Sequence, residues 1–254
     1  MQVPYDDFEA VKMDKCLGVK GHRMIEEIIF AWSGGKDSAM ALYELQKSQN
    51  YEISVLLTTV TEDYDRISMH GVRSTLLESQ AESIGISLKK VLISKHISNE
   101  EYDLKMESAL KKFKSKGIKK VCFGDIFLED VRRYREENLS GIGMDCLFPI
   151  WKKDTKKLAH FFITSGFGAV ITCVDTKVLN AEFAGREFDI KLLNDLPDGV
   201  DPCGENGEFH TFVYKGSIFK KRIELVKGGR ILRDNRFVFC DLIPLESGKT
   251  ERIT

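Results

Sequence analysis

Residues 33–38, with the sequence Ser-Gly-Gly-Lys-Asp-Ser, constrain the fold of this chain more than any other feature. An apolar run at residues 28–32 precedes them, and a segment with Ala39, Leu42 and Leu45 at helical spacing follows. The order is therefore strand, glycine loop, helix. A loop of this kind directs backbone N–H groups and a helix N-terminus towards one point, and that point attracts phosphate.

The side chains of this glycine loop (residues 33–38) also suit a phosphate ligand. We expect Lys36 to clamp phosphate with its positive charge, and Ser33 and Ser38 to donate hydroxyl hydrogen bonds. Asp37 provides a hard oxygen ligand for Mg²⁺, or it caps the helix that follows. A glycine turn without a ligand is the competing interpretation, and the strand–loop–helix context argues against it.

Strand-like and helical segments alternate through the first half of the chain. Strands are predicted at residues 55–60, 91–93 and 120–124, and helices at residues 73–84, 99–117 and 130–139, with Asn99 as an N-cap. This order predicts an α/β fold with a doubly wound parallel sheet, a Rossmann-like (HUP-type) nucleotide-binding domain. Ligands bind beyond the carboxyl ends of such strands, where the glycine loop and Gly124-Asp125 both lie.

The pattern changes near residue 148. A helix with Leu158, Phe161 and Phe162 inward is predicted to end at Gly166, and buried strands are predicted at residues 169–174 and 237–240. Residues 227–230 are predicted to form a hairpin turn. We expect an N-terminal arm at residues 1–23, a nucleotide-binding domain at 24–147 and a smaller α+β domain at 148–254.

Composition limits the function classes. The chain has 254 residues and a formal net charge of −1, which does not favour nucleic acid as a partner. No apolar stretch reaches the roughly 18 residues of a membrane span. The six cysteines are scattered without a Cys-x-x-Cys pair, which argues against zinc ribbons and redox motifs. Cys122 and Cys173 are predicted core thiols, and a reducing cytoplasm is the expected location.

The second half contains one polar cluster, at residues 201–212, with the sequence Asp-Pro-Cys-Gly-Glu-Asn-Gly-Glu-Phe-His-Thr-Phe. We call residues 201–210 the acidic loop. Glu205, Asn206, Glu208 and His210 are candidates for an acceptor site, and either glutamate could receive a proton. A solvated turn with incidental charges is the competing interpretation.

The glycine loop is not a Walker A loop, because its lysine is followed by Asp37-Ser38 and its spacing is shorter. It resembles the PP-loop of the N-type ATP pyrophosphatases. With the acidic loop added, the chain resembles the diphthine–ammonia ligase family of adenine-nucleotide α-hydrolase-like proteins, from about residue 27 to residue 243. The supporting segments are residues 123–124 with the charged helix after them, 148–151, 166–174, 179–186 and 204–211.

The resemblance implies amide formation. Family members that act on elongation factor 2 adenylate the carboxylate of diphthine with ATP, and ammonia then displaces AMP. The implied cofactors are ATP and Mg²⁺, and the implied partners are ATP, ammonia and elongation factor 2, with a homodimer left open. From the motifs and the resemblance we expect the nucleotide to be bound by Ser33, Gly34, Gly35, Lys36, Asp37, Ser38, Gly124 and Asp125. We expect Lys36, Asp37, Glu205 and Glu208 to take part in catalysis, with a metal ion on Asp37. We expect the acceptor to be bound by His70, Arg73, Arg132, Asn206 and His210.

Some of these expectations have direct alternatives. Residues 70–73 could form an ordinary surface loop. Arg132 and Arg135 could stabilise phosphate, or form a solvated basic face paired with Glu129 and Glu136. Asp125 could hold a metal or ribose, or cap the turn that follows.

The chain also departs from the family pattern at one position. The family carries Gly-Ala-Ile where this chain has Gly124-Asp125-Ile126, which indicates a side branch. Two other functions therefore remain in competition. One is a PP-loop pyrophosphatase that acts on a small carboxylate or on tRNA, and the other is a non-catalytic sensor of adenine nucleotides.

Overall fold

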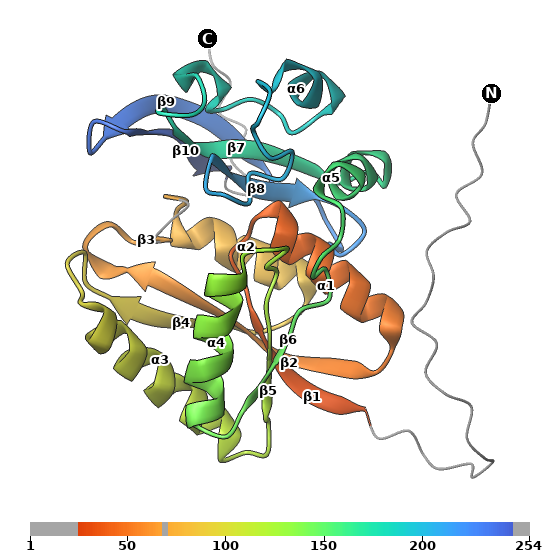
Figure 1. Ribbon diagram of the computed structural model, residues 1–254, viewed down its shortest axis with the longest axis vertical. Coiled ribbons are helices and arrows are strands. Elements are labelled where there is room, and N and C mark those ends of the chain that lie inside the picture. The colour runs from red at the N-terminus through yellow and green to blue at the C-terminus, as the bar shows by residue number, and fades with distance from the viewer. Residues whose placement is uncertain (1–24, 68–70, 246–254) are drawn as a thin grey trace.

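The computed structural model describes residues 25–67 and 71–245, and in it two β-sheets lie one above the other (Figure 1). The first sheet is mainly parallel and the second is antiparallel. The predicted fold class is therefore confirmed: a Rossmann-like α/β sheet is followed by a smaller α+β unit. The predicted domain boundary near residue 148 stays a prediction, and the predicted arm at residues 1–23 lies outside the described residues.

The first sheet is built from β1 (Glu26–Ala31), β2 (Tyr51–Thr61), β4 (Leu88–Ile93), β5 (Lys120–Cys122) and β6 (Asp145–Leu147). These strands are parallel in the order β4-β2-β1-β5-β6. The sequence did not predict β6, nor β3 (Arg66–Ile67), which pairs antiparallel with the end of β2. The strand order reverses between β1 and β5, the point where ligands bind in open α/β sheets.

Helices cover both faces of this sheet. They are α1 (Lys36–Ser48), α2 (Ser74–Ile84), α3 (Asn99–Lys114) and α4 (Glu129–Gly141). Leu110 of α3 and Leu139 of α4 pack with Ile29 and Val121 in one core cluster. Helices α1 and α2 belong to the other cluster, which continues into the second sheet. They therefore lie between the two sheets, as Figure 1 shows.

One predicted helix start was wrong by a residue. The N-cap of α3 is Ser98, not Asn99, and it forms a capping box with Glu101. The serine hydroxyl accepts the amide hydrogen of Glu101, and the glutamate side chain accepts the amide hydrogen of Ser98. This reciprocal pair satisfies two N–H groups, which Asn99 as N-cap would not have done.

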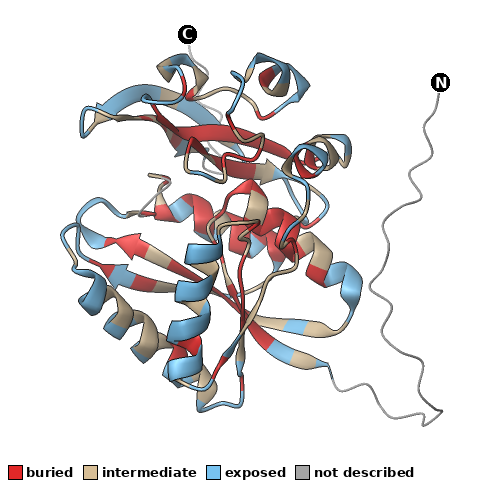
Figure 2. Ribbon diagram, viewed as in Figure 1, coloured by how far each residue is buried: buried red, intermediate tan, exposed pale blue. Residues whose placement is uncertain are grey.

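The second sheet contains β7 (Gly168–Asp175), β8 (Phe209–Lys215), β9 (Leu225–Arg233) and β10 (Phe237–Pro244), in the order β8-β7-β10-β9. Helices α5 (Thr155–Thr164) and α6 (Ile190–Asp195) and the 3₁₀ turns η1 (Glu62–Tyr64) and η2 (Ala181–Phe183) complete the described elements. Every residue of β7 is buried. Figure 2 shows buried residues where this sheet meets α1 and α2.

The predicted hairpin turn at residues 227–230 was wrong, because β9 runs through it without a break. Gly228 and Gly229 lie in the strand, opposite an irregularity in β10 between Cys240 and Leu242. The turn is made instead by Asp234 and Asn235, whose φ angles are 51° and 47°. Two left-handed residues form the tight turn that a twisted hairpin requires, and Asp and Asn tolerate this conformation.

Two further findings bear on the sequence analysis. All the cysteines in the described part of the chain are free thiols, and Cys122 and Cys173 are buried, as predicted. Among residues 25–67 and 71–245, no helix is long and apolar enough to cross a membrane.

Candidate functional site

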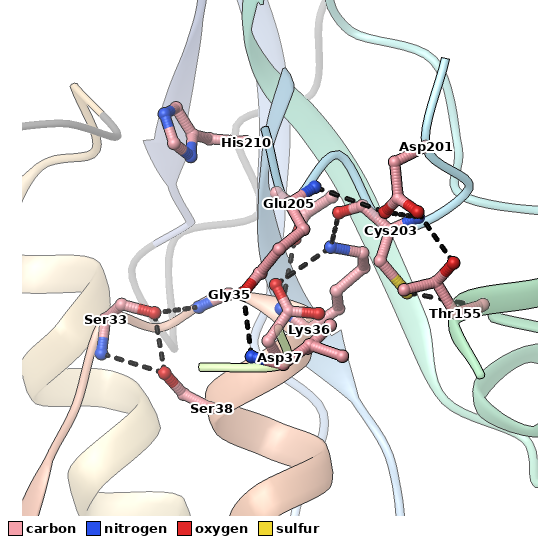
Figure 3. Close-up of polar contacts among 12 residues, drawn as sticks. Ser33, Gly35, Lys36, Asp37, Ser38, Thr155, Asp201, Cys203, Glu205 and His210 are labelled. Atoms are coloured by element: carbon pink, nitrogen blue, oxygen red, sulfur yellow. Dashed lines mark hydrogen bonds and ion pairs between the residues drawn. The ribbon is translucent and has the colours of Figure 1, made fainter. Parts of the chain in front are cut away.

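The glycine loop connects the carboxyl end of β1 to the first turn of α1. Its backbone turns at Gly34, where φ is 77° and where a Cβ atom would lie 2.8 Å from Oε1 of Gln80. Ser33 and Ser38 hold the loop closed, because their hydroxyl oxygens are 2.7 Å apart and the Ser33 hydroxyl accepts the N–H of Gly35 at 3.2 Å (Figure 3). The local sequence thus fixes the loop geometry.

The N-terminus of α1 has no side-chain cap. The N-cap residue is Gly35, so the alternative in which Asp37 caps the helix was wrong. Asp37 lies in the first turn, where a carboxylate interacts favourably with the helix dipole. Its Oδ2 is 2.9 Å from Nζ of Lys36, while Oδ1 is buried and has no hydrogen-bond partner among the described residues. That oxygen is a free position for a cation.

Lys36 is buried, with 3% of its surface exposed, at the junction between the two halves of the chain. Its Nζ donates to Asp37 and to the carbonyl oxygen of Cys203 in the acidic loop (Figure 3). It also lies 5.4 Å from the centre of the Phe209 ring. Burial alone would lower the pKa of Lys36, but the negative charge of Asp37 and its hydrogen bond raise it, so the lysine stays charged.

Gly124 and Asp125 follow β5, as predicted. A Cβ on Gly124 would lie 2.9 Å from the backbone of Asp37 and Ser38, so glycine is needed for the close approach to the glycine loop. The Asp125 carboxylate pairs with Arg135, at 2.7 Å from Nε and 3.1 Å from Nη2. Arg135 also lies over the Phe123 ring, 4.3 Å from its centre. Asp125 therefore orients an arginine.

The acidic loop is held by its own carboxylates. Asp201 Oδ1 accepts the N–H groups of Cys203 and Glu205, and Oδ2 accepts the Thr155 hydroxyl at 2.6 Å. Glu208 is buried, and its Oε1 accepts the N–H of Asp201 and the amide of Asn206, both at 3.0 Å. These bonds give Glu208 a structural role in the loop.

Glu205 and His210 are the titratable residues of the acidic loop that line the same cavity as the glycine loop. Glu205 Oε1 accepts the N–H of Ile126 at 2.7 Å and of Phe127 at 3.3 Å. Burial raises the pKa of Glu205 to about 7. Burial also lowers the pKa of His210 to about 4, so its imidazole is neutral at neutral pH. Glu205 therefore gives the site a carboxyl group whose pKa lies near neutrality.

One cavity of about 340 Å³ collects these groups. The predicted residues that line it are Ser33, Gly35, Lys36, Asp37, Ser38, Gly124, Asp125, Glu205 and His210. Its lining also includes Thr58 and Thr59 near the end of β2, Tyr102 of α3, Arg135 of α4 and Thr211 of β8. The cavity lies at the reversal of strand order, where the fold predicts a ligand.

Other predicted residues lie elsewhere. Arg73 pairs with Asp241 of β10 at 2.7 Å, away from the cavity. Arg132 pairs with Glu136 at 2.7 Å and lies over the Trp151 ring. Asn206 and Glu208 do not line the cavity, and His70 lies outside the described residues. Within residues 25–67 and 71–245, no group of three or more His, Cys, Asp or Glu side chains is placed to hold a metal.

Gln80 is a site residue that the sequence analysis missed. It is fully buried on α2, accepts the Trp32 indole N–H at 2.9 Å, and donates to the carbonyl oxygens of Gly34 at 3.0 Å and Val213 at 2.6 Å. Thr211 has a related role, because its hydroxyl accepts the N–H of Lys36 at 3.0 Å. The only sign of the role of Gln80 in the sequence is a glutamine at a position of a predicted helix that faces the core, and this is a weak signal.

Comparisons with known proteins agree with this architecture. The family model of the diphthamide synthase N-terminal domain matches residues 26–145, and that of the C-terminal domain matches residues 154–242. The chain is 29% identical over 212 residues to the diphthine–ammonia ligase of Schizosaccharomyces pombe. The aligned region covers 76% of this chain and 35% of that protein. The chain is 28% identical over 214 residues to the diphthine–ammonia ligase of Danio rerio, and this aligned region covers 75% of this chain and 83% of that protein.

The chain thus spans about a third of the yeast relative and most of the fish relative. The two family models follow one another in the same order as the two sheets of the fold. The resemblance predicted from the glycine loop and the acidic loop is confirmed by both comparisons. This chain belongs to the diphthamide synthase family.

Proposed function

We propose that the protein is an ATP-dependent ligase that adenylates a carboxylate and then amidates it with ammonia, with release of AMP and pyrophosphate. Diphthine on elongation factor 2 is the acceptor we propose, because both relatives are named diphthine–ammonia ligases. One observation carries the proposal: the glycine loop and the acidic loop, about 170 residues apart in the chain, line the same cavity.

The glycine loop supports binding of the triphosphate. The α1 N-terminus has a glycine N-cap without a side-chain cap, and the Thr211 hydroxyl accepts the N–H of Lys36, so the N–H groups that follow in the first turn are the ones that could bind an anion. Lys36 contributes a positive charge that burial keeps away from water. Negative charge develops on the departing pyrophosphate, and donors fixed at that position stabilise the transition state more than the bound substrate.

Asp37 is the residue that would hold Mg²⁺. Its buried Oδ1 lacks a partner in the described chain, and a carboxylate oxygen suits this cation. Because no cluster of three metal-binding side chains lies in the described residues, the phosphates of ATP would supply further ligands. The bound cation would neutralise phosphate charge.

The reaction divides into two steps. A carboxylate oxygen of the acceptor bonds to the α-phosphorus of ATP, and the bond from that phosphorus to pyrophosphate breaks. Ammonia then bonds to the acyl carbon, the bond from this carbon to the AMP oxygen breaks, and a proton leaves the nitrogen. Glu205 lines the cavity with a pKa near 7, so it can accept that proton at neutral pH.

The test is release of AMP and pyrophosphate from protein incubated with MgATP, ammonium and elongation factor 2 that bears diphthine. We expect the acceptor to stimulate pyrophosphate release, and Lys36→Ala to abolish this stimulation. Omission of ammonium should leave the acceptor adenylated and unamidated, which mass spectrometry of the acceptor detects. Absence of both products with every component present would contradict the proposal.

A further inference from the structure

A basic groove of about 610 Å³ lies between β4 and α3, outside the candidate site. The cationic side chains that line it are Lys89, Lys90, Lys105, Lys112 and Lys116, and no acidic residue lines it. Lys90 is neutralised by Glu78 at 2.5 Å. The other four have no ion pair within the described ranges 25–67 and 71–245, so the groove has a net positive charge.

The floor of the groove is an open sheet edge. Within the described residues β4 pairs with β2 alone, and Figure 1 shows β4 at the margin of the first sheet with α3 beside it. Four consecutive residues of β4, 89–92, line the groove, as a strand does when its edge is exposed. The Leu92 carbonyl oxygen accepts a hydrogen bond from Nζ of Lys105 at 2.7 Å, so this oxygen points outwards rather than towards β2.

We propose that this groove binds an extended, acidic polypeptide segment, which adds to β4 as a further strand. An unpaired edge offers backbone donors and acceptors to such a segment, a common mode of peptide recognition. Lys112 lies in the last turn of α3 and Lys116 in the turn that follows the helix, and both line the groove. Alternate residues of a strand are about 6.6 Å apart and lie on the same face, so carboxylates at every second position would all face the lysines on one side of the groove.

A peptide fits the groove better than a nucleic acid does. Proteins that bind single-stranded nucleic acid without sequence preference use exposed aromatic rings, on which the bases stack. The only ring in the groove lining is that of Phe113, which is half-buried with Nζ of Lys116 over it at 5.9 Å. Apolar side chains of Leu92 and Leu104, which are 44% and 65% exposed, provide instead contacts for the uncharged face of a strand.

The experiment measures fluorescence anisotropy of a labelled peptide, about eight residues long, that alternates glutamate and valine. We expect binding that weakens roughly tenfold with the double variant Lys105→Glu, Lys112→Glu, because two attractive charges become repulsive. The matched control is Lys156→Glu with Lys157→Glu, which makes the same charge change on exposed lysines of α5. Circular dichroism spectra check that both variants fold.

A second arm tests the strand pairing without changing the protein. Methylation of the backbone nitrogens at alternate positions of the same peptide should abolish binding, because the donors to the β4 edge are lost while the charge is unchanged. Equal binding of the methylated peptide, or tighter binding of a single-stranded oligonucleotide of equal charge, would overturn the proposal. If the unmodified peptide does not bind, the proposal is also overturned. The lysines would then serve only to keep the exposed edge of β4 from pairing with other chains.

Discussion

The glycine loop and the acidic loop line the same cavity but are stabilised in different ways. Hydroxyl groups and a left-handed glycine fix the glycine loop: the hydroxyls of Ser33 and Ser38 lie 2.7 Å apart, and the Ser33 hydroxyl accepts the N–H of Gly35. The acidic loop is fixed by the carboxylates of Asp201 and Glu208, which accept N–H groups of the loop itself. A carboxylate in such a loop therefore does not by itself indicate a catalytic role, because two of the three carboxylates in the acidic loop stabilise the loop's own backbone.

The largest effect should follow from a change in the glycine loop. We expect Lys36→Met to lower the rate of pyrophosphate release by roughly a hundred- to a thousandfold, because a fixed charge at the leaving group is lost. Lys157→Met on the exposed surface of α5 is the matched control. Since Lys36 also neutralises the buried Asp37, a thermal melt must accompany the assay. An unchanged rate in the folded variant would remove the glycine loop from the chemistry.

The two glutamates of the acidic loop give the next effect. Glu205→Gln should lower the rate of amide formation roughly a hundredfold, because a proton acceptor in the cavity is lost. Glu208→Gln should change it little, because an amide oxygen still accepts the N–H of Asp201. Steady-state amidation rates of the two variants make the comparison. A larger loss with Glu208→Gln would show that the assigned roles are reversed.

Glu205 also predicts a pH dependence. Its deprotonated form is required as a base, so the amidation rate should rise with pH through about 7, and Glu205→Gln should remove that rise. Because its pKa is raised above the ordinary value of 4.5, this group makes the free energy of unfolding fall as pH increases from 4.5 towards 7. Denaturant titrations should show a shallower fall for Glu205→Gln, and an identical pH profile would count against the raised pKa.

A smaller effect is expected at Gln80, which joins the two halves of the site. Gln80→Leu removes the acceptor of the Trp32 N–H and one hydrogen-bond donor each from the carbonyl oxygens of Gly34 and Val213, and should lower the free energy of unfolding by about 3 kcal/mol. Denaturant unfolding measures this, with Gln46→Leu on the exposed face of α1 as control. A loss equal to that of the control would mean that the buried amide does not couple the halves.

The smallest effect is expected at Asp125, which pairs with Arg135. Asp125→Ala should lower the free energy of unfolding by less than about 1 kcal/mol, because the pair with Arg135 is partly exposed. A double-mutant cycle with Arg135→Ala measures the coupling between the two side chains. A coupling energy near zero would show that Asp125 does not orient the arginine.

Most of the fold could be predicted from the sequence, because the strand–helix alternation of the first half is a periodic and local signal. The order of strand, loop and helix around residues 33–38 was predicted for the same reason, and β1 and α1 confirm it. The hairpin turn was misplaced because Gly228-Gly229 has the composition of a turn, although the register with β10 keeps it extended. The role of Gln80 depends on a partner far along the chain, Val213, and the role of Glu208 depends on the folded shape of the acidic loop. Neither can be predicted from a local sequence pattern.

The central claim is that the chain breaks ATP at the α-phosphorus. The most direct measurement uses ATP with labelled phosphorus at the α position, together with Mg²⁺, ammonium and the acceptor, and separates the products chromatographically. The account predicts label in an acyl-adenylate and then in AMP, with an equal amount of pyrophosphate. Label found in ADP, with inorganic phosphate as the second product, would contradict it.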